Sequence, residues 1–487
     1  MSQAATEPSA PTGAAPDASP GADPNGADPN GIDARVFPST ARRGRRCGQL
    51  KLGGVRATEL VERHGSPLYV VDEEEARNRA CTIREALQRE AERIGTEASV
   101  YYAGKAFLCV EVARWMAEEG MSLDVASGGE LAVALAAGVD PARIGFHGNN
   151  KSVAEIERAV AAGVGTIVLD SEIEIERVAE AARAAGVVQR VRLRVNSGVH
   201  ASTHDFLATS HEDQKFGQPL AEAPRIVRAI AAHDALDFVG LHCHIGSQIF
   251  ATDGFRESAR RLLGVYRELA EIRGGAIPEL NLGGGFGIAY TSAQADDAPA
   301  IETIARELAD IVAETCDALG VPIPKLAFEP GRSVIGQAGV TLYTVGTTKA
   351  VALAGSDAGG DPADLGAGER LYVSVDGGMS DNARPALYGA DYQVRIANRA
   401  SDAEPALVRV VGKHCEAGDI VVQRDLLPGD VAPGDVLAVA ATGAYCWSLS
   451  SNYNYVPRPP VVAVREGSSR VIVRGETEDE LLAKSVV

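Results

Sequence analysis

The amino-acid sequence predicts an α/β fold, a TIM-type (β/α)8 barrel, followed by a second domain built of β-strands. The first observation is an alternation of strand-like apolar runs with helical stretches rich in Ala, Glu and Arg, which gives eight units in about 250 residues. The second is that most runs end in an unusual polar residue, at the face where the active sites of barrels gather. The third is that the helical stretches stop after residue 337. The alternation alone is also compatible with an open, doubly wound sheet.

Four regions are expected along the chain. Residues 1–33 form a low-complexity tail with a tandem Ala-Asp-Pro-Asn-Gly repeat, which buries too little apolar surface to offset the entropy of ordering, so we expect disorder. Residues 34–72 hold short segments, including the strand-like run Pro67–Val71, and this segment is expected to contribute strands to the β domain. The barrel is expected over residues 73–337, beginning with a charged helix, and the β domain over residues 338–487.

Lys105 follows the first predicted barrel strand and is a candidate reactive amine. The run Ala98–Ala103 is rich in aromatic and apolar residues, as is typical of a short buried strand, and a helical spacing of apolar residues begins at Val110. Lys105 lies between the two, at the mouth of the strand. Partial loss of solvation there lowers the pKa of a lysine and suits its amine to bonding covalently with a carbonyl carbon. The alternative is a lysine that simply extends into solvent.

The other strands repeat this pattern. The eight barrel strands are expected to end near Ala103, Ala126, Gly148, Asp170, Asn196, Ile245, Leu282 and Glu329. The polar or special residues at these ends are Lys105, Asp124, His147, Asp170, Arg194, His244, the glycines after Leu282, and Glu329. Because the C-terminal ends of parallel barrel strands meet at one face, these residues are expected to surround one site.

Three strand ends indicate particular ligands. Gly283–Gly285 follow the seventh strand, where barrels often hold a phosphate on backbone N–H groups, although a plain structural turn is the alternative. Glu329 and Arg332 flank a turn after the eighth strand, where a surface ion pair is the alternative. His242 and His244 share one face of the sixth strand and are compatible with a metal site. No third ligand stands out, so we expect no metal and prefer stacking of His244 on an aromatic cofactor.

The β domain is indicated by strand-like runs without intervening helices. These runs cover residues 341–345, 372–375, 392–396, 408–411, 436–440, 461–464 and 471–473. The segment Gly355–Gly368 is rich in Gly, Asp, Ala and Pro and is expected to be a mobile loop. Cys415 lies beside Glu416 in this domain. An exposed thiol is a suitable proton donor, whereas a lone cysteine is otherwise a small core residue.

Composition narrows the class of protein. The chain has 487 residues with 45% hydrophobic and 23% charged, which is ordinary for a globular protein large enough for two domains. The net charge of -19 argues against nucleic acid and anionic membranes as partners. Seven cysteines, an odd number without a pairing rhythm, favour reduced thiols in a cytoplasmic enzyme. The N-terminus lacks the features of a signal peptide, and no apolar run approaches the length of a membrane span.

Together these residues resemble the diaminopimelate decarboxylases, in the fold-type III pyridoxal-phosphate group that also contains ornithine and arginine decarboxylases and alanine racemase. The resemblance covers about residues 67–458. The motifs that carry it are Tyr102-Ala103-x-Lys105-Ala106, Asp124-x-x-Ser127-x-x-Glu130, His147-Gly148-Asn149-Asn150-Lys151, Arg194-Val195-Asn196, Lys215-Phe216-Gly217, His244-Ile245-Gly246-Ser247-Gln248, Gly283-Gly284-Gly285, Glu329-Pro330-Gly331-Arg332 and Cys415-Glu416. Phe107 and Ser197 depart from the family pattern, and neither is assigned chemistry.

The resemblance implies pyridoxal 5'-phosphate as the cofactor. Lys105 is implied to bond to its aldehyde, Glu329 to pair with its ring nitrogen and His244 to stack on its ring, while Cys415 returns a proton to the substrate after CO2 leaves. The implied catalytic residues are thus Lys105, Cys415, His244 and Glu329. The implied cofactor-binding residues are Lys105, Asp124, His244, Ser247, Gly283, Gly284, Gly285, Glu329, Gly331, Arg332 and Tyr445.

The implied substrate is meso-2,6-diaminopimelate, whose decarboxylation to L-lysine and CO2 is the last step of lysine biosynthesis. The implied substrate-binding residues are Arg332, Arg384, Tyr388, Glu416 and Tyr445. The far end of this substrate is a whole amino-acid head group, so the arginines and Tyr388 would hold its carboxylate and Glu416 its ammonium group. In this family the cysteine segment enters the site of the other subunit, which implies a homodimer with shared active sites.

Other functions remain as alternatives. A decarboxylase of the same fold that acts on ornithine, arginine or carboxynorspermidine would leave Arg384 without a carboxylate to bind. An amino-acid racemase would need a base on each face of the reacting carbon. It is disfavoured because the substrate-binding residues named above suit a substrate with two carboxylates. A non-catalytic pyridoxal-phosphate carrier or pseudo-enzyme is disfavoured because the β domain, Lys105 and Cys415 are all present.

Overall fold

The computed structural model describes residues 28–44, 48–199, 214–353 and 368–486. Most of the predicted disordered tail, residues 1–27, and nearly all of the predicted mobile loop at Gly355–Gly368 lie outside the described residues. Within the described ranges, no helix combines the length and the apolar character that crossing a lipid bilayer requires.

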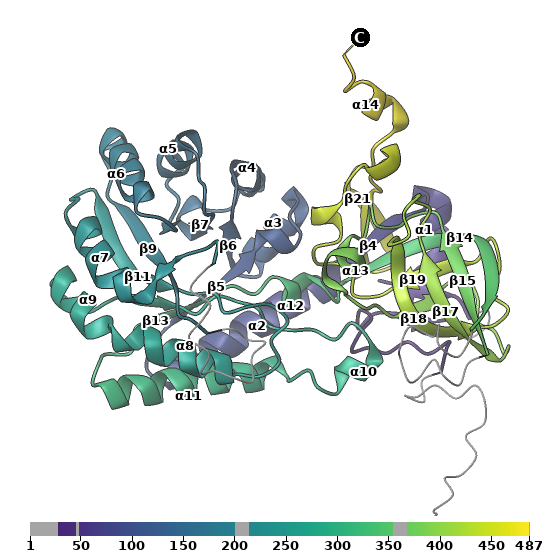
Figure 1. The fold of residues 1–487 in the computed structure, drawn as a ribbon, viewed down its shortest axis with the longest axis horizontal. Helices are drawn as coiled ribbons and strands as arrows, with labels where there is room; N and C mark the ends of the chain where they lie inside the picture. Colours follow the sequence, from purple (N-terminus) through teal and green to yellow (C-terminus); the bar gives the residue numbers. More distant parts are fainter. Residues whose placement is uncertain (1–27, 45–47, 200–213, 354–367, 487) are drawn as a thin grey trace, which may run out of the picture.

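Eight parallel strands form a closed barrel, as the sequence predicts (Figure 1). They pair in the order β9-β11-β12-β13-β5-β6-β7-β8, and the pairing of β8 with β9 closes the ring, which excludes an open doubly wound sheet. The strands are β5 (Ala98–Ala103), β6 (Ser122–Val125), β7 (Ile144–Phe146), β8 (Thr166–Leu169), β9 (Gln189–Asn196), β11 (Leu236–His242), β12 (Glu279–Asn281) and β13 (Lys325–Phe328).

Helices surround the barrel and cover its outer face (Figure 1). They are α2 (Glu73–Arg93), α3 (Val110–Glu118), α4 (Gly128–Ala136), α5 (Val153–Ala162), α6 (Ile173–Ala185), α7 (Ala223–Ala231), α8 (Asp253–Gly264), α9 (Tyr266–Arg273) and α11 (Ile301–Leu319). Each presents apolar residues to the strands; in α7, for example, Ile226, Val227 and Ile230 are fully buried.

Helix caps fix the loops that follow β6 and β7. The Ser127 side chain accepts a hydrogen bond from the Glu130 N–H and caps α4, and Ser152 and Glu155 form a capping box at α5. Glu155 Oε1 also accepts a hydrogen bond from the Gly128 N–H at 2.6 Å, which ties the two helix starts together. These loops therefore hold the strand ends that carry Asp124 and His147.

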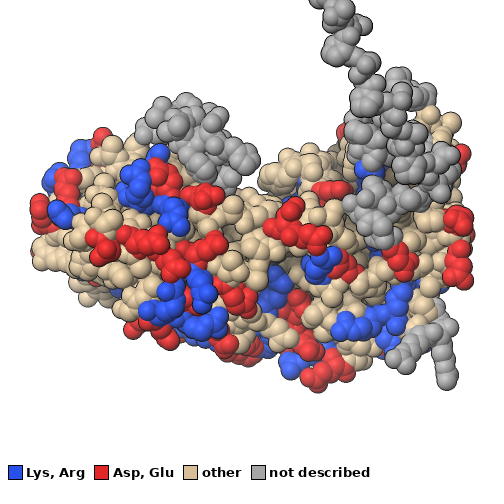
Figure 2. Space-filling model, turned by 90° about the horizontal axis from the view of Figure 1, so that it is seen from below, with Lys and Arg blue, Asp and Glu red and all other residues tan. Residues whose placement is uncertain are grey.

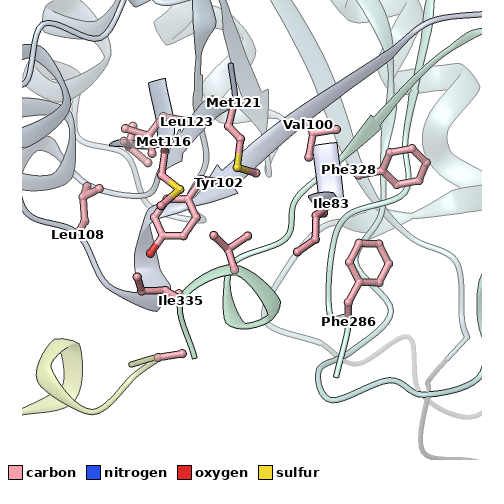
Figure 3. Close-up of a cluster of buried hydrophobic side chains, with 14 of the residues drawn as sticks. Ile83, Val100, Tyr102, Leu108, Met116, Met121, Leu123, Phe286, Phe328 and Ile335 are labelled. Atoms are coloured by element: carbon pink, nitrogen blue, oxygen red, sulfur yellow. The ribbon is translucent and has the colours of Figure 1, made fainter. Parts of the chain in front are cut away.

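The main core lies between the barrel strands and the helices packed on them. Figure 3 shows Tyr102, Met116, Met121 and Leu123 in one group, and each is no more than 1% exposed. The Tyr102 hydroxyl donates a hydrogen bond to the Phe107 carbonyl at 2.6 Å, so the ring is buried without leaving its polar atom unpaired. This bond bridges the turn that contains Lys105.

A mixed sheet forms the second domain, beside the barrel (Figure 1). Its strands run in the order β18-β17-β15-β14-β4-β20-β21, and β19 pairs with β14 and β16. They are β4 (Leu68–Asp72), β14 (Gly339–Ala352), β15 (Glu369–Val375), β16 (Val394–Ile396), β17 (Pro405–Val411), β18 (Ile420–Pro428), β19 (Val436–Val439), β20 (Val461–Arg465) and β21 (Ser468–Val473). The strand β18 and the short helices α13 (Arg384–Tyr388) and α14 (Glu478–Leu482) were not singled out from the sequence.

The strand β4 lies inside this sheet although it precedes the barrel in the chain. It pairs antiparallel with β14 and parallel with β20. All five of its residues are buried. The chain thus leaves the mixed sheet at Asp72, builds the barrel, and returns to the sheet at β14.

The two domains meet at the turn that holds Lys105. The Tyr445 N–H donates to the Ala106 carbonyl at 2.7 Å, and the Ser448 hydroxyl donates to the same carbonyl at 3.1 Å. The rings of Phe107 and Trp447 pack edge to face with centroids 5.5 Å apart. The mixed-sheet domain therefore lies against the C-terminal face of the barrel.

The surface carries both signs of charge. Figure 2 shows Lys and Arg interspersed with Asp and Glu over the face seen from below. Outer helices form exposed pairs such as Arg228–Glu268 and Arg256–Glu314, both at 2.9 Å. Such exposed pairs contribute little to stability.

Candidate active site

Lys105 lies in a single turn of 3-10 helix, Gly104–Ala106, directly after β5. Its side chain is exposed at the strand mouth, whereas both neighbours in the turn are buried. The surrounding protein still removes much of the water around the amine, and this desolvation lowers the pKa of Lys105, with Glu329 opposing the effect and Arg194 adding to it. An amine with a lowered pKa that remains accessible is suited to bonding with a carbonyl carbon.

Glu329 follows β13 and sits in a cluster of polar side chains from four strand ends. Asn281 Nδ2 donates to Glu329 Oε1 at 2.6 Å, and His242 Nε2 lies 3.1 Å from the same oxygen. His147 Nε2 lies 3.5 Å from Glu329 Oε1 and 3.2 Å from Asp124 Oδ1. We call Asp124, His147, His242, Asn281 and Glu329 the carboxylate cluster.

Burial and charge decide where protons lie in this cluster. Desolvation lowers the pKa of both His147 and His242 to about 4, so the two imidazoles are neutral near pH 7. Burial opposes ionisation of Glu329, but His242 and His147 stabilise its carboxylate and hold its pKa well below the usual value. Burial and the adjacent Glu329 raise the pKa of Asp124. The surroundings therefore favour the ionised form of Glu329 and disfavour that of Asp124.

The carboxylate cluster also has the composition of a metal site. His147, His242 and Glu329 each offer a ligand atom, and these atoms lie within 4.8 Å of one another. His147 and Glu329 are thus potential co-ligands of His242. The sequence did not reveal them as such because they follow other strands, β7 and β13. His242 and Asn281 form hydrogen bonds with Glu329, whereas the buried His147 Nε2 has no hydrogen-bond partner among the described residues.

His244 and the glycine loop lie against each other. Gly283 has φ 70°, and a Cβ added to Gly284 would lie 2.0 Å from the Glu329 carbonyl oxygen, so both positions require glycine. The Gly284 N–H donates to His244 Nδ1 at 3.4 Å, and the Gly283 N–H donates to Asn281 Oδ1 at 2.8 Å. Two of the three glycine amides predicted to hold a phosphate therefore have acceptors within the protein.

Burial lowers the pKa of His244 to about 3, and Lys105 adds to the effect. The imidazole is therefore neutral, and its Nδ1 is the acceptor of the Gly284 bond. A neutral, half-buried ring beside Lys105 is compatible with stacking on an aromatic ligand.

Arg332 opens the short helix α12 (Arg332–Ile335) next to Ser247 and two tyrosines. Its Nη2 donates to Ser247 Oγ at 2.7 Å, and its Nη1 donates to the Tyr290 hydroxyl. The guanidinium carbon lies 4.8 Å from the Tyr445 ring centroid and 5.7 Å from that of Tyr290. The structure thus brings together Ser247, Arg332 and Tyr445, all predicted to bind cofactor.

Arg384 opens α13 and shares Tyr290 with Arg332. Its Cζ lies 4.7 Å from the Tyr290 ring centroid, and its Nη1 donates to the Tyr392 hydroxyl at 2.5 Å. We call Tyr290, Arg332, Arg384, Tyr392 and Tyr445 the arginine–tyrosine cluster. Among the described residues, neither Arg332 nor Arg384 forms an ion pair with a carboxylate, and the buried Arg332 Nε has no hydrogen-bond partner. The positive charges of these two guanidinium groups are therefore not balanced by an acidic side chain among the described residues.

Three further predicted site residues are exposed: Tyr388 and Glu416, predicted to bind substrate, and Cys415, predicted to be catalytic. Tyr388, at the end of α13, is 68% exposed. Cys415 and Glu416 are exposed on the mixed-sheet domain, where the Cys415 N–H donates to Asn454 Oδ1 at 3.3 Å. Across the described part of the chain, no hydrogen bond or ion pair links Cys415 or Glu416 to Lys105 or Glu329.

The two remaining strand-end residues pair with each other. Arg194 Nε lies 3.9 Å from Asp170 Oδ1, and the Arg194 guanidinium lies 4.4 Å from the Phe216 ring centroid. The Gly217 N–H donates to Asp170 Oδ1 at 3.1 Å. These contacts tie the ends of β8 and β9 to the Lys215-Phe216-Gly217 motif.

The residues present fit pyridoxal phosphate. The accessible amine of Lys105 suits its aldehyde, and the carboxylate of Glu329 suits its ring nitrogen. The neutral imidazole of His244 suits its aromatic ring, and Arg332, which has no acidic partner among the described residues, suits its phosphate. Gly331 allows close packing, because an added Cβ would lie 3.0 Å from the Ala103 carbonyl oxygen and 3.1 Å from the Ala106 Cβ.

Several site residues were not assigned chemistry from the sequence. His147 stood out only as a strand-end residue and His242 only as half of a histidine pair, and no role was assigned to Asn281, Tyr290 or Tyr392. Asn281 precedes the glycine loop and could have been found from its position as the last residue of a barrel strand. Tyr290 and Tyr392 join a site only through contacts between distant segments.

A family model described as "Pyridoxal-dependent decarboxylase, pyridoxal binding domain" matches residues 80–336. A diaminopimelate decarboxylase from Mycobacterium tuberculosis is 50% identical over 457 residues, which cover 93% of this chain and 98% of that protein. The diaminopimelate decarboxylase from Bacillus subtilis is 42% identical over 438 residues, covering 89% of this chain and 94% of that protein.

The fold is also similar to that of solved diaminopimelate decarboxylase structures. A crystal structure of diaminopimelate decarboxylase from M. jannaschii, in complex with L-lysine, is 32% identical with a TM-score of 0.80. The match covers 92% of this chain and 98% of that one.

Proposed function

The chain belongs to the diaminopimelate decarboxylase family of pyridoxal-dependent decarboxylases, and on this premise we propose that it converts meso-2,6-diaminopimelate to L-lysine and CO2. This reaction is the final step of lysine biosynthesis. The structural observation that carries the substrate is the pair of guanidinium groups, Arg332 and Arg384, without a carboxylate partner among the described residues. With Arg332 proposed to face the cofactor phosphate, Arg384 is left for a carboxylate at the far end of the substrate; ornithine has none there, so it is not favoured as the substrate.

Lys105, Glu329 and His244 are proposed to hold pyridoxal 5'-phosphate. When bound, this cofactor accepts the electron pair that the departing CO2 leaves behind. Lys105 would bond to its aldehyde carbon. The Glu329 carboxylate would keep a proton on the ring nitrogen, and the carboxylate cluster supports this role because its histidines lower the pKa of Glu329.

The phosphate is proposed to lie near Ser247, Gly285, Gly331 and Arg332. Arg332 donates to Ser247, so the two side chains can face one anion together. Gly283 and Gly284 are proposed to shape this loop by allowing its close packing, since their N–H groups donate to Asn281 and His244. Tyr445 would orient Arg332 through its ring.

Substrate recognition is proposed to use both ends of diaminopimelate. Arg384, with Tyr388 nearby on α13, would bind the carboxylate that remains in the product, and Glu416 the ammonium group beside it. Cys415 would deliver the proton that replaces CO2. Because Cys415 and Glu416 are exposed and lack contacts to Lys105 among the described residues, we propose that they serve the site of a second copy in a homodimer.

The test is turnover by the purified protein reconstituted with pyridoxal phosphate. We expect CO2 and L-lysine from meso-diaminopimelate and little product from ornithine or arginine under the same conditions. Borohydride reduction of the reconstituted protein should fix the cofactor on the peptide that contains Lys105. Turnover of ornithine alone would contradict the proposed substrate, and labelling of another lysine would contradict the proposed role of Lys105.

A further inference from the structure

Tyr290 lies between the two guanidinium groups of the arginine–tyrosine cluster. It is 4% exposed, with Arg384 Cζ 4.7 Å and Arg332 Cζ 5.7 Å from its ring centroid. Its hydroxyl also accepts a hydrogen bond from Arg332 Nη1. One buried side chain therefore contacts both cations.

The backbone at Tyr290 and two residues before it is held by glutamine side chains. Gln248 Nε2 donates to the Ile288 carbonyl at 2.5 Å, and the Ile288 N–H donates to Gln248 Oε1 at 3.3 Å. The Tyr290 N–H donates to Gln294 Oε1 at 3.0 Å. Gln248 adopts a left-handed backbone conformation with φ 61°, which is uncommon for a residue other than glycine. These contacts fix the point from which the Tyr290 ring projects.

Tyr392 completes the frame around Arg384. Its hydroxyl accepts the Arg384 Nη1 bond at 2.5 Å, and its ring meets that of Tyr290 edge to face, at 5.3 Å and 80°. Arg384 also lies 5.6 Å from the Tyr392 ring centroid. The direction of the Arg384 guanidinium is therefore set by two aromatic rings and one hydroxyl.

A tyrosine is the kind of residue that can hold two cations without neutralising either. Guanidinium groups stay charged at every physiological pH, so two of them near one ring repel each other. The negative face of an aromatic ring attracts each cation, but the ring has no net charge. A carboxylate at this position would form ion pairs with the arginines and compete with an anionic ligand. Tyr290 leaves both positive charges available.

We propose that Tyr290 is a positioning residue that sets the separation and direction of the Arg332 and Arg384 guanidinium groups. The site would thereby select a cofactor and a substrate that each present one anionic group, one to each arginine. The inference rests on the proposed function, in which these groups are the cofactor phosphate and the carboxylate at the far end of the substrate. Neither Arg332 nor Arg384 has an acidic partner among the described residues that would orient it instead.

Two ligands that differ in one carboxylate test this inference. L-lysine retains the far-end carboxylate of the substrate, whereas cadaverine is the same molecule without it. Inhibition constants for both would be measured against the reconstituted full-length protein and its Tyr290→Phe and Tyr290→Leu variants. Tyr372→Leu is the matched control, because Tyr372 makes a similar contact with Arg409, at 5.8 Å, elsewhere in the mixed sheet.

We expect Tyr290→Leu to raise the inhibition constant of L-lysine about tenfold and leave that of cadaverine within about twofold. Tyr290→Phe keeps the ring and loses the hydroxyl, so we expect a rise of about threefold for L-lysine. KM for diaminopimelate should rise in parallel, with a smaller change in kcat. Tyr372→Leu should change neither inhibition constant.

Equal weakening of L-lysine and cadaverine, or no change in either, would overturn the positioning role of Tyr290. The thermal unfolding midpoint of Tyr290→Phe, read by circular dichroism, checks that the variant is folded. Failure of the proposed function looks different: the unsubstituted protein would then neither decarboxylate diaminopimelate nor bind L-lysine more tightly than cadaverine.

Discussion

Glu329 keeps its charge because its neighbours are neutral hydrogen-bond donors. His242 Nε2 and Asn281 Nδ2 both reach its carboxylate, at 3.1 and 2.6 Å. A cationic side chain in direct contact with Glu329 would neutralise the carboxylate and weaken its hold on a protonated ring nitrogen. Burial and the nearby Glu329 raise the pKa of Asp124, which disfavours a second negative charge beside Glu329. The hydrogen bonds from His242 and Asn281 thus hold the Glu329 carboxylate, whose ionised form the cluster favours, in one position.

The buried histidines predict how stability depends on pH. Burial lowers the pKa of His242 from 6.5 to about 4, so between these values the unfolded chain binds a proton that the folded chain does not. The free energy of unfolding therefore falls as pH decreases through this range, by about 2 kcal/mol at pH near 5 for this one group. His242→Gln should show a shallower fall, measured by urea unfolding between about pH 8 and pH 5.

His233→Gln is the control for this measurement, because His233 is a partly exposed histidine outside the carboxylate cluster. The control should retain the pH dependence of the unsubstituted protein. An unchanged slope in His242→Gln would mean that His242 does not titrate differently in the folded and unfolded chains.

At the scale of elements, the glycine loop after β12 is packed against the end of β13. A Cβ on Gly284 would lie 2.0 Å from the Glu329 carbonyl oxygen and 2.7 Å from its carbon, both backbone atoms. Gly284→Ala should therefore displace the segment that carries Glu329. Because small displacements of a reacting group cost about a hundredfold in rate, we expect at least that loss of activity, measured as kcat/KM for diaminopimelate.

Gly264→Ala, at the end of α8, is the matched control, since a Cβ there would have no atom within 4 Å. We expect unchanged activity and equal or higher stability in this variant. Full activity in Gly284→Ala would show that the glycine loop and the end of β13 can move apart without loss of catalytic activity.

A buried ion pair joins three other elements of the barrel. Lys151 Nζ lies 2.9 Å from Glu174 Oε1 and donates to the Gly148 and Val168 carbonyls at 2.6 and 2.8 Å. Glu174 Oε2 accepts the Asp170 N–H at 2.8 Å. The pair thus connects the loop after β7, the strand β8 and the helix α6.

Lys151→Met leaves the Glu174 carboxylate buried without a cation. We expect this to lower the free energy of unfolding by about 3–5 kcal/mol, read from urea unfolding at neutral pH. The double variant Lys151→Met/Glu174→Gln removes both charges and should recover part of that loss. If the double variant is no more stable than Lys151→Met, the uncompensated charge is not the cause.

The sequence predicts strand ends well and contacts between distant segments poorly. Lys105, Asp124, His147, His244 and Glu329 were found because each follows an apolar run, a feature of the local pattern. The closeness of His147 to Glu329 depends instead on closure of the barrel through β8 and β9, which no local pattern records.

The mixed-sheet domain gave weaker signals for a similar reason. The helix α13 has five residues, too few to show a helical period, yet it carries the buried Arg384. Tyr290 contacts both arginines only because three segments, after β12, β13 and β15, meet at one point. Their positions follow from the packing of two domains, so the arginine–tyrosine cluster was not predictable as a unit.

At the scale of the whole molecule, the exposed Cys415 and Glu416 predict shared sites in a homodimer. Lys105→Ala and Cys415→Ala should each be inactive alone. After subunit exchange, a mixed dimer would hold one intact site, so the mixture should recover up to about one quarter of the activity. The measurement is CO2 release after co-refolding or prolonged mixing, with exchange shown by differently tagged chains.

Two copies of the same variant, treated in the same way, are the control for this experiment. They should recover nothing, because every site in such a dimer lacks the same group. Absence of recovery after demonstrated exchange would mean that Cys415 acts in the site of its own chain.

The place of β4 between β14 and β20 has a consequence for biosynthesis of the chain. Leu68–Asp72 leave the ribosome before the whole barrel, whereas both neighbouring strands emerge after it. During translation, β4 therefore lacks its hydrogen-bonding partners β14 and β20 until the segments that follow the barrel have been synthesised. A fragment truncated before Val461 would expose one side of that strand, so nascent chains stalled there should attract chaperones more strongly than finished ones.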